Sequence, residues 1–390
     1  VYTAGIIKHD IVTTADTSNP LGAKVIPEKG GDLSISVKRD ITGPALDRTQ
    51  FFMDWFEYVD YKPGIDSGVF KVAGFDKGWY INLPGFKQNL AAFGGGDITL
   101  NAGRNINRIS ASVPATLYED SADGFNYRDG SGNLYIEAGG DINSGLFFVG
   151  DGDGVIYSGG SLDAGRVVTG TQTPVYTAFA LMGGTLDVMS RKDLNHHNIV
   201  NPTYLHTTVN RAIFTYSENS QVSLTSLAGD VRFLVNKSAT NELPKSVTLN
   251  LLPVGTRLED SLNMNPGIYN VTAVRGDIIF EGDNPVNGVM FFPNEQGNIR
   301  LLAEGDFNLN AFTLTELDTR LDFLPTFQNQ KRLESQLGNV TKLGNAALTV
   351  PNILSNPPLH SNDMEPVRVV ARNGDIVADE FALAEQSRFI

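Results

Sequence analysis

The feature that most constrains the fold of this chain is an internally repeated segment of about eleven residues. Each copy begins with glycine followed by Asp, Asn or Thr, and then alternates apolar and polar residues up to a small residue. A further apolar residue follows eight positions after the first. Longer copies begin at Gly31, Gly96, Gly132, Gly184 and Gly297, and shorter ones at Gly229, Gly276 and Gly374. Such repetition is typical of solenoid proteins.

Each part of the repeat has a physical reason. Glycine adopts positive φ without a steric penalty, and Asx side chains bond to nearby backbone, so Gly-Asx predicts a turn. The alternating residues predict a strand with one buried face. Small residues recur at Ala102, Ala138, Ser190 and Ala303, where a tight corner leaves little room. A second strand that begins eight residues after the first indicates a chain that coils.

The spacing of the copies predicts a parallel β-helix with insertions. Asp32 and Asp97 are 65 residues apart, and Asp277 and Asn298 are 21 apart. Turns of roughly 21 to 25 residues, with loops added, would account for these intervals. Ten to fifteen turns stacked ~4.8 Å apart would give a rod of roughly 50 to 70 Å. The alternative is an antiparallel sandwich or barrel, but glycine precedes Asx here more often than it follows it, unlike in hairpin loops.

Composition limits the class of protein. The 390 residues carry a net charge of −14, so a basic face for nucleic acid is not expected. Cysteine is absent, which excludes disulfides, thiolate zinc sites and a cysteine nucleophile. The sequence contains no run of about 20 apolar residues, so it predicts no membrane-spanning helix. The chain starts without Met and without a signal-peptide pattern, so we expect a piece of a longer protein or a processed product.

Two segments depart from the repeat within what we predict to be a single solenoid over residues 1–390. Residues 44–93 are rich in aromatic side chains, and the spacing of Phe52, Trp55 and Phe56 favours a short helix over Asp47–Tyr58. Trp55, Trp79 and Tyr80 are candidates for a contact surface for glycan or protein, and the alternative is a lid packed on the side of the coil. Residues 311–366 form a long irregular excursion with several prolines.

Candidate metal ligands are few. Asp129, Ser131 and Asn133 place oxygens at alternating positions, as a calcium loop requires, although the segment lacks the EF-hand glycine and glutamate. The alternative is a turn whose side chains bond their own backbone. His196, His197 and His206 lie close in sequence, but adjacent histidines on a strand point to opposite faces. We therefore predict no cofactor, with calcium as the open alternative.

An enzymatic role is the alternative to a structural one. Polysaccharide lyases and hydrolases on β-helices use carboxylates together with a basic residue. Here most Asp and Glu residues stand at the repeat corners, where turn chemistry already explains them. The sequence holds no nucleophile elbow, phosphate loop or zinc-binding helix motif. We therefore predict no catalytic residues and a protein that is not an enzyme.

The repeated Gly-Gly-Asp-Ile strings resemble the filamentous haemagglutinin family of large bacterial exoproteins. The similarity extends beyond the generic repeat and covers most of the chain. It is carried by Pro84–Ile98, Gly139–Gly150, Phe214–Val231 and Pro366–Ile376. The family's N-terminal secretion domain is not recognisable, so the chain resembles an internal or C-terminal stretch of the shaft.

The resemblance implies a right-handed β-helix, export by two-partner secretion through an outer-membrane partner, and display at the bacterial surface. The expected function is an adhesin shaft that mediates attachment to a glycan or protein on a host or neighbouring cell. Open ends of such a coil would also allow end-to-end self-association into extracellular filaments. The alternative functions on the same scaffold are glycan binding and polysaccharide degradation.

Overall fold

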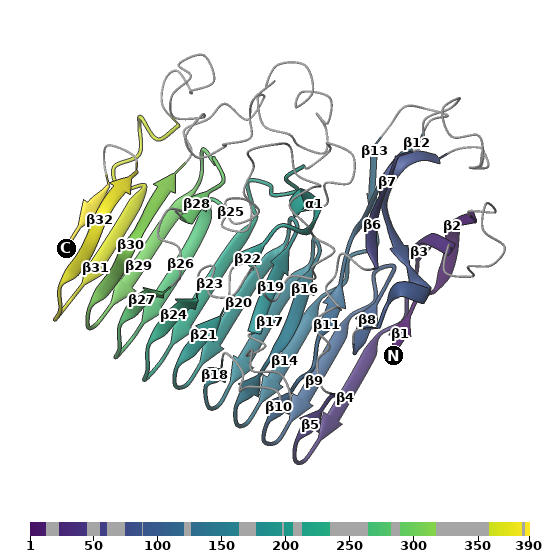
Figure 1. Ribbon diagram of the computed structural model, residues 1–390, viewed down its shortest axis with the longest axis horizontal. Coiled ribbons are helices and arrows are strands. Elements are labelled where there is room, and N and C mark those ends of the chain that lie inside the picture. The colour runs from purple at the N-terminus through teal and green to yellow at the C-terminus, as the bar shows by residue number, and fades with distance from the viewer. Residues whose placement is uncertain are drawn as a thin grey trace.

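The chain forms an all-β structure dominated by parallel sheets, seen here in a computed structural model (Figure 1). The structure describes residues 1–12, 23–44, 55–60, 75–87, 89–120, 126–163, 177–196, 199–205, 213–234, 264–281, 289–316, 359–383 and 387–390. Helical structure in these ranges is limited to α1 (Pro202–Leu205) and the 3-10 turn η3 (Leu83–Gly85).

One side of the structure is a ten-stranded parallel sheet. Its strands, in spatial and sequence order, are β4 (Leu33–Val37), β9 (Ile98–Ala102), β14 (Leu134–Ala138), β17 (Asp153–Ser158), β20 (Thr185–Ser190), β23 (Gln221–Ser226), β26 (Ile268–Ala273), β29 (Asn298–Ala303), β31 (Val367–Ala371) and β33 (Arg388–Phe389). Because sequence order and spatial order agree, each pass of the chain lies directly beside the previous one (Figure 1).

A second parallel sheet of eleven strands receives the chain after nine of these ten passes. Its members are β5 (Ile41–Thr42), β10 (Ile106–Asn107), β15 (Ile142–Asn143), β18 (Leu162–Asp163), β21 (Leu194–His196), β24 (Val231–Leu234), β27 (Ile278–Glu281), β30 (Phe307–Glu316), β28 (Val289–Phe291), β25 (Met264–Asn265) and β32 (Ile376–Ala382). We call one pass through the ten-stranded sheet, with the strand that follows it in this sheet, a rung.

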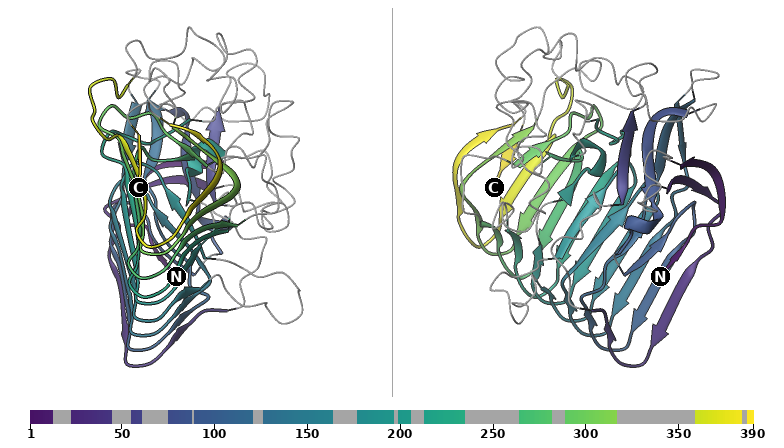
Figure 2. Two further views of the ribbon diagram at one scale, coloured as in Figure 1. Left: turned by 90° about the vertical axis from the view of Figure 1, so that its left-hand side faces the viewer. Right: turned by 45° about the vertical axis from the view of Figure 1, so that its right-hand side comes forward.

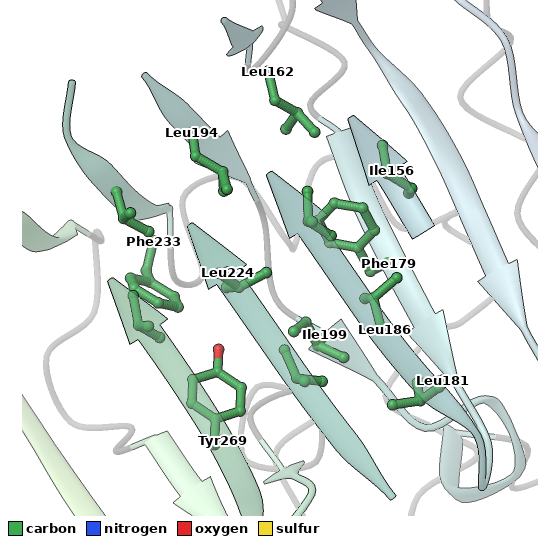
Figure 3. Close-up of a cluster of buried hydrophobic side chains, with 14 of the residues drawn as sticks. Ile156, Leu162, Phe179, Leu181, Leu186, Leu194, Ile199, Leu224, Phe233 and Tyr269 are labelled. Carbon is green, nitrogen blue, oxygen red and sulfur yellow. The ribbon is translucent and has the colours of Figure 1, made fainter. Parts of the chain in front are cut away.

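A six-stranded parallel sheet completes the early rungs. It contains β1 (Tyr2–Thr3), β8 (Leu90–Ala92), β11 (Ala111–Val113), β16 (Gly145–Val149), β19 (Thr177–Leu181) and β22 (Ile199–Val200). Apolar side chains from the three parallel sheets meet in one continuous core. Figure 3 shows Ile156, Leu186 and Leu224 of the ten-stranded sheet pointing toward Phe179 and Ile199 of the six-stranded sheet.

The register of the ten-stranded sheet explains the small residues of the repeat. Strand pairing places Ala102, Ala138, Ser158, Ser190 and Ser226 in one column, which continues through Ala273, Ala303 and Ala371. All eight residues are buried. The column lies at the end of each strand, before the chain turns toward the eleven-stranded sheet. Small side chains are therefore stacked along the whole corner, as the repeat predicts.

The predicted turn length is wrong in detail. Equivalent residues Leu134 and Gly154 are 20 positions apart, whereas Ile299 and Val367 are 68 apart. The interval from Asp277 to Asn298 joins two different corners, because Asp277 precedes a strand of the eleven-stranded sheet and Asn298 begins a strand of the ten-stranded sheet. The strand that begins at Asp153 does not follow the sequence pattern, since Gly154 replaces the first apolar residue of the repeat. Ten strands correspond to about 43 Å, nine intervals of ~4.8 Å.

An antiparallel sheet forms a lid near the N-terminal end. It contains β13 (Asn126–Asp129), β12 (Thr116–Asp120), β7 (Phe75–Asn82), β3 (Ala23–Glu28), β2 (Ile6–Val12) and β6 (Phe56–Asp60), and it lies near the first rungs, packed against the six-stranded sheet (Figure 2). The predicted helix over Asp47–Tyr58 is wrong where it is described, because Phe56–Asp60 pairs with β7 as a strand. Residues 317–358 of the predicted excursion lie outside the described ranges, while residues 311–316 extend β30.

Candidate functional site

A column of hydrogen bonds runs along the corner between the ten-stranded and eleven-stranded sheets. On most rungs, the Oδ1 atom of an Asp or Asn accepts a hydrogen bond from the backbone N–H of the equivalent residue on the next rung, at 2.8–3.0 Å. We call this column the corner ladder. Its members are Asp40, Asn105, Asp141, Ser161, Asp193, Asp230, Asp277, Asp306 and Asp375.

The corner ladder explains why the repeat requires Asx. A carboxylate or amide oxygen reaches the next rung and satisfies a backbone donor that the turn removes from regular strand pairing. At Asp40, the backbone hydrogen bond from Asn105 and the guanidinium of Arg104 hold the pKa of the carboxyl below its usual value. Asp230 accepts from the N–H of Asp277 through Oδ1 and pairs with Arg232 through Oδ2 at 2.6 Å.

At the corner before the ten-stranded sheet, the glycine before Asx is needed because the backbones of adjacent rungs approach closely, and not because its φ is positive. A Cβ on Gly96 would lie 2.3 Å from the carbonyl oxygen of Gly31, and one on Gly132 would lie 1.9 Å from that of Gly96. Neither residue adopts positive φ. The sequence-based reason for these glycines is therefore wrong, although the turn itself is confirmed. Adjacent rungs approach so closely here that no side chain fits.

The predicted calcium ligands lie at the other corner, before the ten-stranded sheet. Oδ1 of Asn133 accepts from the N–H of Asp153 at 2.9 Å, and Oγ of Ser131 accepts from the N–H of Asp151 at 2.7 Å. These oxygens therefore accept from backbone 20 residues further along the chain, and not from the backbone of their own turn as the alternative predicts. The side chain of Asp129 lies outside the described part. Among the described residues, no group of three or more His, Asp or Glu side chains is placed to hold a metal ion.

The predicted aromatic contact surface is not at the surface. Trp55, Trp79 and Tyr80 are at most 1% exposed. Trp55 packs against Phe86 and Phe148, with ring centroids 5.1 and 5.9 Å away, in a core between the antiparallel lid and the six-stranded sheet. Tyr80 lies in a separate small cluster within the lid. This corrects the contact-surface hypothesis in favour of its alternative, a lid packed on the side of the stack.

A partly buried ion pair connects the lid to the parallel strands. Arg128 of β13 binds Asp151 through both Nε and Nη2, and its Nη1 donates to the carbonyl oxygen of Thr215 at 3.3 Å. The two charged side chains are 26% and 29% exposed, and burial lowers the pKa of Arg128 to about 10, so the guanidinium stays charged at neutral pH. The contact therefore joins three segments that are distant in sequence.

His196 and His360 occupy two different environments. His196 is buried between the rings of Phe179 and Phe233, so it fills the core. His197 and His206 lie outside the described residues. His360 is also buried, with Nε2 2.8 Å from Glu316 Oε1 and Nδ1 3.6 Å from Asp363 Oδ2. The hydrogen bond with Glu316 is the main reason why the pKa of His360 is raised.

Sequence reasoning missed the partly buried Arg128–Asp151 pair and the buried His360–Glu316 pair. Arg128 and Asp151 are 23 residues apart, and Glu316 and His360 are 44 apart across a non-repetitive segment. Neither pair falls at a repeat position, so no spacing signal connects its members. Each pair forms only through tertiary contacts, between the lid and the stack for Arg128–Asp151, and between a turn and the end of β30 for His360–Glu316.

Comparison of the chain with protein-family models, curated proteins and solved structures found no match. In the described part of the chain, no helix has the length and apolar character needed to cross a membrane.

Proposed function

We propose that this chain is a shaft segment of a secreted or surface-displayed bacterial adhesin, built as a right-handed parallel β-helix. The observation that carries the proposal is the shared register of the ten-stranded sheet, in which equivalent residues stack from Leu33–Val37 through to Val367–Ala371. Each rung adds ~4.8 Å along one axis. Parallel strand pairing between rungs beside a continuous apolar core favours a stiff spacer.

The mechanical part of this proposal is tested by pulling the chain from its two ends. In a repeat protein each unit contacts only its neighbours, so rungs are expected to detach in succession rather than all at once. Each event should release a chain length of up to ~3.5 Å per residue, with increments that match whole rungs. A single all-or-none event, or release at negligible force, would contradict a load-bearing shaft.

The attachment part rests on the family resemblance, and the expected partner is a glycan or protein on a host or neighbouring cell. Beads coated with the purified chain should attach to epithelial or bacterial cells more often than albumin-coated beads. Export is tested separately, by coexpressing the parent protein with and without its outer-membrane secretion partner and labelling intact cells with antibody. If chain-coated beads attach to none of the cells more often than albumin-coated beads do, the adhesin role is rejected and only the spacer role is left.

A second candidate function is end-to-end self-association, favoured by the open sheet edges. Strand β4 has a described partner only on one side, as does β33 at the opposite end. Val37, Phe389 and Ile390 are 38–46% exposed at these ends. Unpaired parallel edges with apolar side chains are templates for another chain. Sedimentation should show concentration-dependent species that Val37→Lys weakens, whereas a single monomeric species at all concentrations would reject this function.

A further inference from the structure

The outward face of the ten-stranded sheet carries a compact mixed patch on β14, β17 and β20. Side chains alternate across each strand, so the residues between core positions face solvent. Strand pairing places Tyr135, Val155 and Asp187 in one row across the strands, and Glu137, Tyr157 and Met189 in the row beside it. We call these six residues the outer patch. Tyr135 and Val155 are 39% and 42% exposed, which is unusual for large apolar side chains on this face.

The carboxylates of the outer patch have no cationic partner in the described part of the chain. Neither Glu137 nor Asp187 takes part in an ion pair there, unlike Asp40, Asp151 and Asp230 at the corners. Partial burial raises the pKa of Asp187, and no described cation offsets this effect. Two carboxylates thus lie on the outward face of the sheet, in the same rows as two tyrosines, with no ion-pair partner among the described residues.

We propose that the outer patch binds an extended cationic peptide segment. Tyrosine faces attract ammonium and guanidinium groups, and the carboxylates supply charge complementarity. Asp187 lies two strands away from Glu137 and two residues away along the strand direction. Strand geometry therefore separates the two residues by roughly 12 Å. An extended peptide spans about 13 Å in four residues, so basic side chains at positions i and i+4 meet both carboxylates. This inference does not depend on secretion or on the adhesin role.

The probe is an unstructured Ser/Gly peptide with lysines four positions apart, titrated into the full chain by calorimetry at low and physiological salt. We expect saturable binding that weakens with salt. The double variant Glu137→Gln/Asp187→Asn should bind about tenfold more weakly, since two exposed pairs contribute about 1.4 kcal/mol together. Tyr135→Ser/Tyr157→Ser should weaken binding, while Tyr135→Phe/Tyr157→Phe should retain it.

The matched control separates this site from general attraction to an acidic protein. Glu218→Gln/Glu295→Gln removes the same two charges from exposed positions outside the patch. Retained affinity in this control supports the outer patch. Equal weakening in the two charge variants, no binding by the unaltered chain, or binding of a neutral linear oligosaccharide in place of the lysine peptide would overturn the proposal.

Discussion

At the scale of single residues, the repeat encodes contacts between rungs rather than contacts within one turn. Asx oxygens of the corner ladder accept from the following rung, and the glycines before them leave room for the backbone of the previous rung. The eleven-residue pattern therefore carries its information in pairs of distant residues. A sequence pattern reveals which residue types recur, but it does not reveal that their hydrogen bonds run along the stack.

Removing one member of the corner ladder should have a measurable cost. Asp230→Ala deletes the acceptor for the N–H of Asp277 and the partner of Arg232. We expect the free energy of unfolding to fall by about 1–3 kcal/mol, because a partly buried donor loses its acceptor. Asp230→Asn keeps the Oδ1 acceptor and should lose less. Urea denaturation of both variants decides, and equal losses would contradict the hydrogen-bond explanation.

The corner ladder also identifies a position at which a substitution should stabilise the fold. Ser161 accepts no hydrogen bond in the ladder, because its side chain is shorter than Asx, although its N–H donates to Asp141. Ser161→Asn places an amide oxygen toward the N–H of Asp193, as Asn105 does toward Asp141. We expect a gain of about 0.5–1 kcal/mol in thermal or urea unfolding. A loss of stability would show that the rung cannot accept the longer side chain.

The His360–Glu316 pair predicts a pH dependence of stability. The pKa of His360 is raised in the folded chain, mainly by the hydrogen bond with Glu316. The folded state therefore binds the proton more tightly than the unfolded state. The stabilisation is fully present below the ordinary histidine pKa of about 6.5 and is lost as pH rises through the higher folded value. His360→Gln should flatten this part of the pH–stability profile, and an unchanged profile would contradict the assignment.

At the scale of elements, the strands at repeat positions were predictable and the lid was not. The two-residue period and the eight-residue spacing between apolar positions are read directly from copies such as Ile98–Ile106. The lid strands belong to residues outside the repeat, and their pairing depends on long-range register. Phe52, Trp55 and Phe56 have helical spacing, yet β6 pairs with β7, because tertiary contacts override a short local pattern.

Removal of the Arg128–Asp151 ion pair should loosen the lid and leave the stack of rungs unchanged. Arg128→Met leaves Asp151 without its cation and removes the donor to Thr215. We expect faster hydrogen exchange in Asn126–Asp129 and a loss of about 1–3 kcal/mol, less than for a fully buried pair because each side chain is about a quarter exposed. Exchange in β23 and β26 should stay unchanged. Uniform acceleration across the chain would contradict an element-level role.

At the scale of the whole molecule, the central claim is that successive rungs stack in register along one axis. The absence of cysteine makes this directly measurable, because introduced pairs of Cys residues are the sole attachment points for spin labels. Asn101 shares one outward column with Thr225, Thr272 and Val370, which lie four, five and seven rungs away.

The decisive measurement is the set of electron–electron distances from a label at position 101 to labels at positions 225, 272 and 370. The stacked rungs predict narrow distance distributions with centres at ~19, ~24 and ~34 Å, because each rung adds ~4.8 Å. Distances that fail to increase with rung number, or a folded chain in which position 370 lies no farther from position 101 than position 225 does, would contradict the account.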